Sequence, residues 1–141
     1  MHKVVLGALV RGGLVLLVHR RADKRAYPGV WDLPGGVMEP GESELAALTR
    51  ELHEELGVRI APGSVAHLCR WTAGAAGEPV LLSAWVVRDW HGTPANVAPE
   101  EHDGLGWFGL EELPPPFHDD MRAALVRAMA SHPGTHAGST D

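Results

Sequence analysis

The chain has 141 residues, 45% of them hydrophobic, with a formal net charge of −6 and an isoelectric point near 5.8. That length fits one domain with a full core, and the acidic balance argues against a DNA-duplex binder, whose surface normally carries a basic patch. The single cysteine, Cys69, excludes an internal disulfide. No apolar run approaches the roughly 20 residues of a membrane span, so we expect a cytoplasmic protein without a membrane partner.

The first third of the chain predicts strands and turns. Two β-branched runs, residues 4–10 and 14–19, are separated by Arg-Gly-Gly, which is typical of a hairpin. A basic loop covers residues 20–29. A short strand at residues 31–33 then leads into Pro34-Gly35-Gly36, which we interpret as a break in the backbone.

The clearest predicted helix covers residues 43–56. Leu45, Leu48, Leu52 and Leu56 form an apolar stripe at spacings of three, four and four. Ser43 is placed to cap its N-terminus, and Gly57 is placed to end it in a left-handed conformation.

The second half predicts strands at residues 65–71, 79–89 and 105–110, followed by an amphipathic helix at 117–129. Strands that alternate with helices and include hairpins favour an α/β fold, with helices flanking a mixed sheet. We expect one domain over residues 1–131 and a flexible tail at 132–141, which is rich in Pro, Gly, Ser and Thr.

The predicted helix carries an unusual group of acids. On a helical wheel Glu51, Glu54 and Glu55 lie within about 100° of one another, and Glu44 falls on nearly the same line. The leucine stripe is centred roughly 110° away, so the acids border the buried face. Carboxylates this close raise one another's pKa unless a cation compensates them. Oxygen-rich sites of this kind suit Mg²⁺ or Mn²⁺, whereas the simpler interpretation is a solvated acidic face.

The acids belong to a longer pattern. From Gly36 the chain reads five residues, Glu42, seven residues, and then Arg50-Glu51-Leu52-x-Glu54-Glu55-x-Gly57-Val58. This resembles the Nudix box of the Nudix hydrolases, with every position present. The flanking segments at residues 31–35 and 99–113 extend the resemblance to about residues 4–129. It implies a Nudix fold, an α/β/α sandwich around a central mixed sheet, and hydrolysis of a nucleoside diphosphate linked to a further group.

The resemblance also implies roles for single residues. It assigns the divalent metal, Mg²⁺ or Mn²⁺, to Glu51, Glu54, Glu55 and a backbone carbonyl of Gly35 or Gly36. It gives supporting roles to the remaining box positions, which are Glu42, Arg50 and Gly57.

The expected chemistry is in-line attack by water on a phosphorus atom of the pyrophosphate. Arg50 could hold the first acid of the box by a bidentate pair. The general base stays open between Glu51 or Glu54 on the helix and Glu100 or Glu101 in the loop before the last strand. Both loop acids could equally be solvated charges.

The substrate is harder to predict. Downstream of the box, the chain lacks the proline that marks ADP-ribose enzymes of the family and the tyrosine that marks diadenosine polyphosphate enzymes. Their absence favours the MutT-like branch. We therefore expect hydrolysis of a (d)NTP, including oxidised forms such as 8-oxo-dGTP, to NMP and pyrophosphate. ADP-ribose, nucleotide sugars and other diphosphates are the alternatives. A non-catalytic nucleotide sensor is disfavoured, because every box carboxylate is present.

The nucleotide pocket has several candidate residues. Trp31 and Trp71 could stack on a base or pack in the core, and Glu100 is also a candidate. Arg20 and Arg25 could contact phosphates or ribose, or lie in a solvated basic loop. The protein is expected to be a monomer or a homodimer, with the apolar run at 80–87 as a possible edge strand.

Overall fold

The computed structural model describes residues 2–23, 29–74, 78–114 and 119–130. Arg25 and the proposed tail at 132–141 lie outside the described residues. In chain order the elements are β1 (His2–Arg11), β2 (Leu14–Arg20), β3 (Trp31–Asp32), β4 (Gly35–Val37), α1 (Glu44–Leu56), β5 (Arg59–Ile60), β6 (Val65–Ala73), β7 (Val80–Val87), β8 (Trp90–His91), β9 (His102–Gly109), a short 3-10 helix (Leu110–Glu112) and α2 (Asp119–Ala130).

The main sheet is mixed, as predicted. The described strands run in the order β3-β2-β1-β7-β6, with β4 paired to β1 and β9 paired to β2. β1 and β7 are parallel, whereas β1 pairs with β2 and with β4 in the antiparallel sense. β5 and β8 form a small separate ladder.

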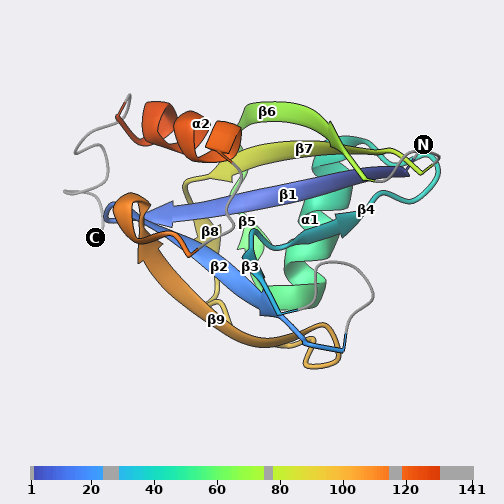
Figure 1. Ribbon diagram of the computed structural model, residues 1–141, viewed down its shortest axis with the longest axis horizontal. Helices are drawn as coiled ribbons and strands as arrows, with labels where there is room; N and C mark the ends of the chain where they lie inside the picture. The colour runs from blue at the N-terminus through green and yellow to red at the C-terminus, as the bar shows by residue number, and fades with distance from the viewer. Residues whose placement is uncertain (1, 24–28, 75–77, 115–118, 131–141) are drawn as a thin grey trace.

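The predicted β1–β2 hairpin exists only at its tip. Val10 pairs with Val15 and Arg11 with Leu14, and beyond this point the two strands diverge. β1 continues between β7 and β4, while β2 continues between β9 and β3. Figure 1 shows this divergence, with α1 lying where the strands have separated. The opening between the strands gives a helix access to the interior.

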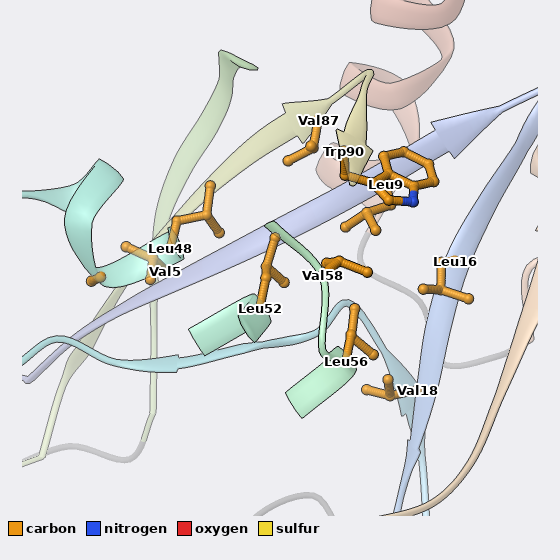
Figure 2. Close-up of a cluster of buried hydrophobic side chains, with 11 residues drawn as sticks. Val5, Leu9, Leu16, Val18, Leu48, Leu52, Leu56, Val58, Val87 and Trp90 are labelled. Atoms are coloured by element: carbon orange, nitrogen blue, oxygen red, sulfur yellow. The ribbon is translucent and has the colours of Figure 1, made fainter. Parts of the chain in front are cut away.

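The two helices cover opposite faces of the sheet. Successive side chains of a strand point to opposite faces; accordingly, Val5 of β1 packs in one core with Leu48 of α1, and Leu6 packs in the other with Leu125 of α2. Figure 1 shows α2 over β6 and β7. Figure 2 shows leucines of α1 pointing toward side chains of β1, β2 and β7. The predicted α/β/α sandwich is therefore confirmed.

Three details differ from the sequence interpretation. Gly35 and Gly36 do not break the backbone, because they pair with Leu6 and Val5 as part of β4. Leu45 does not join the apolar stripe, since it is 41% exposed while the other three leucines are buried. The run at residues 80–87 is not an edge strand, because β7 lies between β1 and β6.

Within the described ranges, no helix is long and apolar enough to cross a membrane.

Candidate active site

The box helix is fixed at both ends by the predicted caps. The Ser43 hydroxyl accepts a hydrogen bond from the amide of Ala46 at 3.1 Å. At the other end Gly57 adopts φ 75°, a left-handed conformation that favours glycine, and its amide bonds to the His53 carbonyl at 3.0 Å. Three fully buried leucines, Leu48, Leu52 and Leu56, fix the rotation of the helix about its axis. The directions of the box glutamates follow from this rotation.

The three glutamates differ sharply in burial. The side chain of Glu55 is 8% exposed and that of Glu51 12%, whereas that of Glu54 is 56% exposed. Burial raises the pKa of Glu55 to about 9, with further contributions from a hydrogen bond with Glu51, from the Glu51 charge and from the charge of Glu101. The amide of Gly35 opposes this shift by donating to Glu55 Oε1 at 3.3 Å. Without a bound cation, the carboxyl groups near the C-terminal end of α1 therefore outnumber the positive groups that could compensate their charge.

The two glycines of β4 make room for these carboxylates. A Cβ atom built on Gly36 would lie 2.5 Å from the Cδ atom of Glu51, so any other residue would displace that side chain. Gly35 adopts φ 152°, and a Cβ there would overlap the carbonyl oxygen of Val5 in the neighbouring strand. Both glycines are thus required by close approach, one by the acid and one by the sheet.

Arg50 links the carboxylates to the loop before the helix. Its Nε and Nη2 atoms donate to the two oxygens of Glu42 at 2.7 and 3.0 Å, which is a bidentate pair. Its Nη1 donates to Glu51 at 3.1 Å and to Glu54 at 3.3 Å. The expectation of a bidentate pair with Glu51 was wrong, because Glu42 receives the fork of the guanidinium and Glu51 receives a single bond. The Arg50 bonds hold the pKa of Glu42 down at about 2.

The loop before β9 brings a second set of polar residues to the same place. His102 is buried, and its Nε2 lies 3.7 Å from Glu55 Oε1. Glu101 is partly buried and adds to the negative charge felt by Glu55, whereas Glu100 is exposed. Of the two loop acids, Glu101 is therefore the one that interacts with the box.

A cavity of about 300 Å³ opens beside the glycines of β4. Much of its apolar lining comes from β1 and β7, and its polar lining includes residues of β2, β3 and β9. The lining residues include Val4, Leu6, Val80, Leu82, Gly35, Gly36, Arg20, Asp32 and His102. The cavity is large enough for a small ligand, and through Gly36 and His102 it borders the carboxylates.

The chemistry of this donor set fits a divalent metal ion. Glu51 and Glu55 supply hard oxygen donors, Glu54 lies on the same helix, and the shortage of positive charge around Glu55 would be relieved by a cation. Within the described ranges, no three acidic, histidine or cysteine side chains are already drawn together as a metal cluster. Glu54 is engaged with Arg50, so its side chain would have to move for all three carboxylates to meet.

Comparison with known proteins agrees with this geometry. The NUDIX domain family matches residues 1–128. The chain belongs to the Nudix family.

The Nudix relatives cover most of the chain. A Mycobacterium tuberculosis protein named "Putative 8-oxo-dGTP diphosphatase 2" is 53% identical over 110 residues, covering 78% of this chain and 74% of the relative. The CTP pyrophosphohydrolase of Escherichia coli K12 is 38% identical over 112 residues, covering 79% and 78%. The crystal structure of a MutT NUDIX hydrolase from Burkholderia pseudomallei superposes with a TM-score of 0.78 at 33% identity, covering 89% of this chain and 95% of that one. The prediction of a MutT-like Nudix hydrolase is confirmed.

The candidate substrate-binding residues lie in different parts of the structure. Arg20 lines the cavity. Trp31 instead packs its ring against His19 and Phe108, at centroid distances of 4.9 and 5.1 Å, and Trp71 packs against the core beneath α2. Neither tryptophan belongs to the cavity lining.

Sequence reasoning missed most of the cavity lining, including the polar residues Asp32 and His102. Both lie within the segments at residues 31–35 and 99–113 that carry the Nudix resemblance. Position inside a recognised segment was the available signal. Only the pairing of β2 with β3 and β9 shows that Asp32 and His102 face one space, since Asp32 pairs with Val18 and His102 with Arg20.

Proposed function

We propose that the protein is a Mg²⁺-dependent nucleoside triphosphate pyrophosphohydrolase that releases NMP and pyrophosphate, with Mn²⁺ as an alternative ion. The observation that carries the proposal is the meeting of the box carboxylates with the cavity at Gly36. Glu51, Glu54 and Glu55 would hold the ion, together with a backbone carbonyl of Gly35 or Gly36. A bound Mg²⁺ supplies charge stabilisation at the phosphoryl oxygens and a more acidic water.

The residues of the chain have separate tasks in this reaction. Arg50 orients Glu51 and Glu54 through its hydrogen bonds to both. Glu101, from the loop before β9, would take a proton from the attacking water, with a helix carboxylate, Glu51 or Glu54, as the alternative. The apolar lining of the cavity would pack against the nucleoside and exclude water from it.

The polar lining of the cavity bears on the choice of base. A carboxylate such as Asp32 accepts a hydrogen bond from an exocyclic amine, and a guanidinium such as Arg20 donates to a base carbonyl. Cytosine and guanine carry both groups, whereas adenine has no carbonyl and uracil has no exocyclic amine. Two of the relatives are named for a cytosine nucleotide and for an oxidised guanine nucleotide. We therefore propose a CTP-type or dGTP-type substrate, including 8-oxo-dGTP.

The remaining features of the proposal are more general. One Nudix domain spans residues 1–131, acts in the cytoplasm on a small nucleotide, and needs neither duplex DNA nor a membrane. It acts as a monomer or a homodimer.

The test is product release from a panel of nucleotides in the presence of Mg²⁺ or Mn²⁺. The panel holds the common NTPs and dNTPs, 8-oxo-dGTP, ADP-ribose, a nucleotide sugar and a diadenosine polyphosphate. Pyrophosphate release, faster from CTP or a guanine triphosphate than from UTP, is the expected result. Activity confined to ADP-ribose or a nucleotide sugar would overturn the substrate proposal, and no turnover of any compound would overturn the enzyme proposal.

A further inference from the structure

The loop between β8 and β9 is bonded to the C-terminal end of the box helix. The amide of Ala95 donates to the Leu56 carbonyl at 3.1 Å, and the amide of Val97 donates to the Glu55 carbonyl at 3.0 Å. The last carbonyls of a helix have no partner within the helix itself. The loop therefore supplies partners to the last turn of α1, including the residue whose carboxylate lies in the site.

Asn96 closes this loop with its side chain. Its Nδ2 donates to the His102 carbonyl at 2.8 Å, and its Oδ1 accepts from the Ala98 amide at 3.3 Å. Asn96 lies between the two loop amides that bond to α1, Ala95 and Val97. The exposed side chain of Asn96 thus links the loop segment that bonds to α1 with His102, the first residue of β9.

Glu101 lies inside the segment that Asn96 closes. Its amide donates to the Ala98 carbonyl at 2.8 Å, and its own carbonyl accepts from the Arg21 amide at 3.2 Å. The next residue, His102, places its ring 3.7 Å from the Glu55 carboxylate. The backbone of Glu101 is therefore held on both sides, between the Asn96 closure and the His102 contact.

We propose that Asn96 is a positioning residue of the reaction. By closing the loop at residues 95–102 onto α1, it holds Glu101 at a fixed position relative to Glu55. This inference rests on the proposed pyrophosphohydrolase function and on Glu101 acting on the substrate. Asn96 does not itself line the cavity, and its side chain bonds to backbone groups of His102 and Ala98. Its effect on turnover passes through Glu101.

Removal of the Asn96 side chain should leave the fold in place. Asn96 is exposed, and the two bonds from the loop to α1 are made by backbone amides that the substitution keeps. The change therefore loosens the position of Glu101 rather than the core. A displacement of about 1 Å in a reacting group can slow a reaction on the order of a hundredfold.

The experiment is a double-mutant cycle with Asn96→Ala, Glu101→Gln and the double variant, assayed on the best triphosphate of the wild type. Asn96→Ala should lower kcat about tenfold or more, with KM changed less than about twofold. The double variant should be no slower than Glu101→Gln by more than about twofold, because both changes remove the same contribution. Asn96→Asp, which keeps the acceptor for Ala98 but loses the donor to His102, should fall between the wild type and Asn96→Ala.

A matched control comes from another loop. The Ser64 hydroxyl closes its own turn by donating to the carbonyls of Ala61 and Asp89 at 2.7 and 2.9 Å. Among the described residues, these hydroxyl bonds reach neither α1 nor the β8–β9 loop. Ser64→Ala removes a comparable closing side chain and should keep kcat within about twofold of the wild type.

The outcomes separate this inference from the proposed function. If the wild type hydrolyses a triphosphate and Asn96→Ala matches its kcat, the inference is overturned and the proposed function stands. The inference also fails if the losses in kcat multiply in the double variant, or if Asn96→Ala is slow while Glu101→Gln is not. If Asn96→Ala does not fold, the cycle is run with Asn96→Asp and judged by the same criteria. A wild type without triphosphate hydrolysis contradicts the proposed function itself.

Discussion

Two glutamates of the box helix, Glu44 and Glu55, both have side chains that are little exposed but lie in opposite electrostatic surroundings. The side chain of Glu44 is 10% exposed and forms an ion pair with Lys3 at 2.8 Å and another with Arg70 at 3.0 Å. It also accepts hydrogen bonds from Ser83 and from Trp85. Burial alone would raise its pKa, but these donors outweigh burial and hold the pKa at about 2. Burial and neighbouring acids instead raise the pKa of Glu55 to about 9.

The difference shows how one helix carries both an anchor and a site. Glu44 has enough donors around it to be an ion in the interior without any ligand, so it fastens the N-terminus of α1 to β1, β6 and β7. Among the described residues, Glu55 has one backbone donor, the amide of Gly35, and three acidic or polar neighbours, Glu51, Glu101 and His102. A buried acid cluster that is short of donors is the one expected to take up a cation.

Glu54→Gln should have the largest effect on turnover. The substitution keeps the volume of the side chain but removes its charge, so metal-dependent turnover should fall on the order of a thousandfold. Because Glu54 is 56% exposed at its side chain, the melting temperature should change little. Steady-state kinetics with Mg²⁺ give the measurement, and a variant with wild-type kcat would remove Glu54 from the metal site.

Gly36→Ala should have the next largest effect. The added Cβ would lie 2.5 Å from the Glu51 carboxyl carbon and would displace that side chain, so we expect kcat to fall about tenfold to a hundredfold. Gly104→Ala is the control, because a Cβ there meets nothing closer than 3.8 Å. Equal kcat values for the two variants would show that the close approach at Gly36 has no role.

The sequence predicted the acids of the site better than their surroundings. The helix and its caps at Ser43 and Gly57 follow from spacing and local preference, and the structure confirms them. The expectation that the acids border the buried face holds for Glu51 and Glu55 but not for Glu54, whose side chain is 56% exposed. A helical wheel places Glu44 on the same line as Glu51, but it cannot show that Lys3 and Arg70 reach Glu44 from β1 and β6.

Long-range pairing explains most of what was missed. Gly35 and Gly36 form a strand because they pair with β1, which lies about 30 residues earlier in the chain. The contact between His102 and Glu55 depends on the way in which the β8–β9 loop packs on α1. No local pattern contains such contacts, because they form between segments that are distant in sequence.

Glu44→Gln should have the smallest effect on activity and act mainly on stability. The loss of two ion pairs to a partly buried carboxylate should lower the free energy of unfolding by about 1–3 kcal/mol, while kcat stays within about twofold. Because the folded pKa of Glu44 lies below its ordinary value, its contribution is present above pH 4.5 and is lost as the pH falls toward about 2. Urea denaturation at neutral pH gives the measurement, with the exposed Glu111→Gln as control.

The stability of the metal-free protein as a function of pH, with and without Mg²⁺, shows whether the buried Glu55 carboxyl belongs to a cation site. A carboxyl whose folded pKa is raised stabilises the fold fully below its ordinary pKa of 4.5, and this contribution is lost as the pH rises toward about 9. The melting temperature of the chelated wild type should therefore fall over this range relative to that of Glu55→Gln. Added Mg²⁺ should restore the wild type, and more strongly near pH 8.5 than near pH 5.5. Identical pH profiles for the two chelated proteins, with no stabilisation of the wild type by Mg²⁺, would contradict the account.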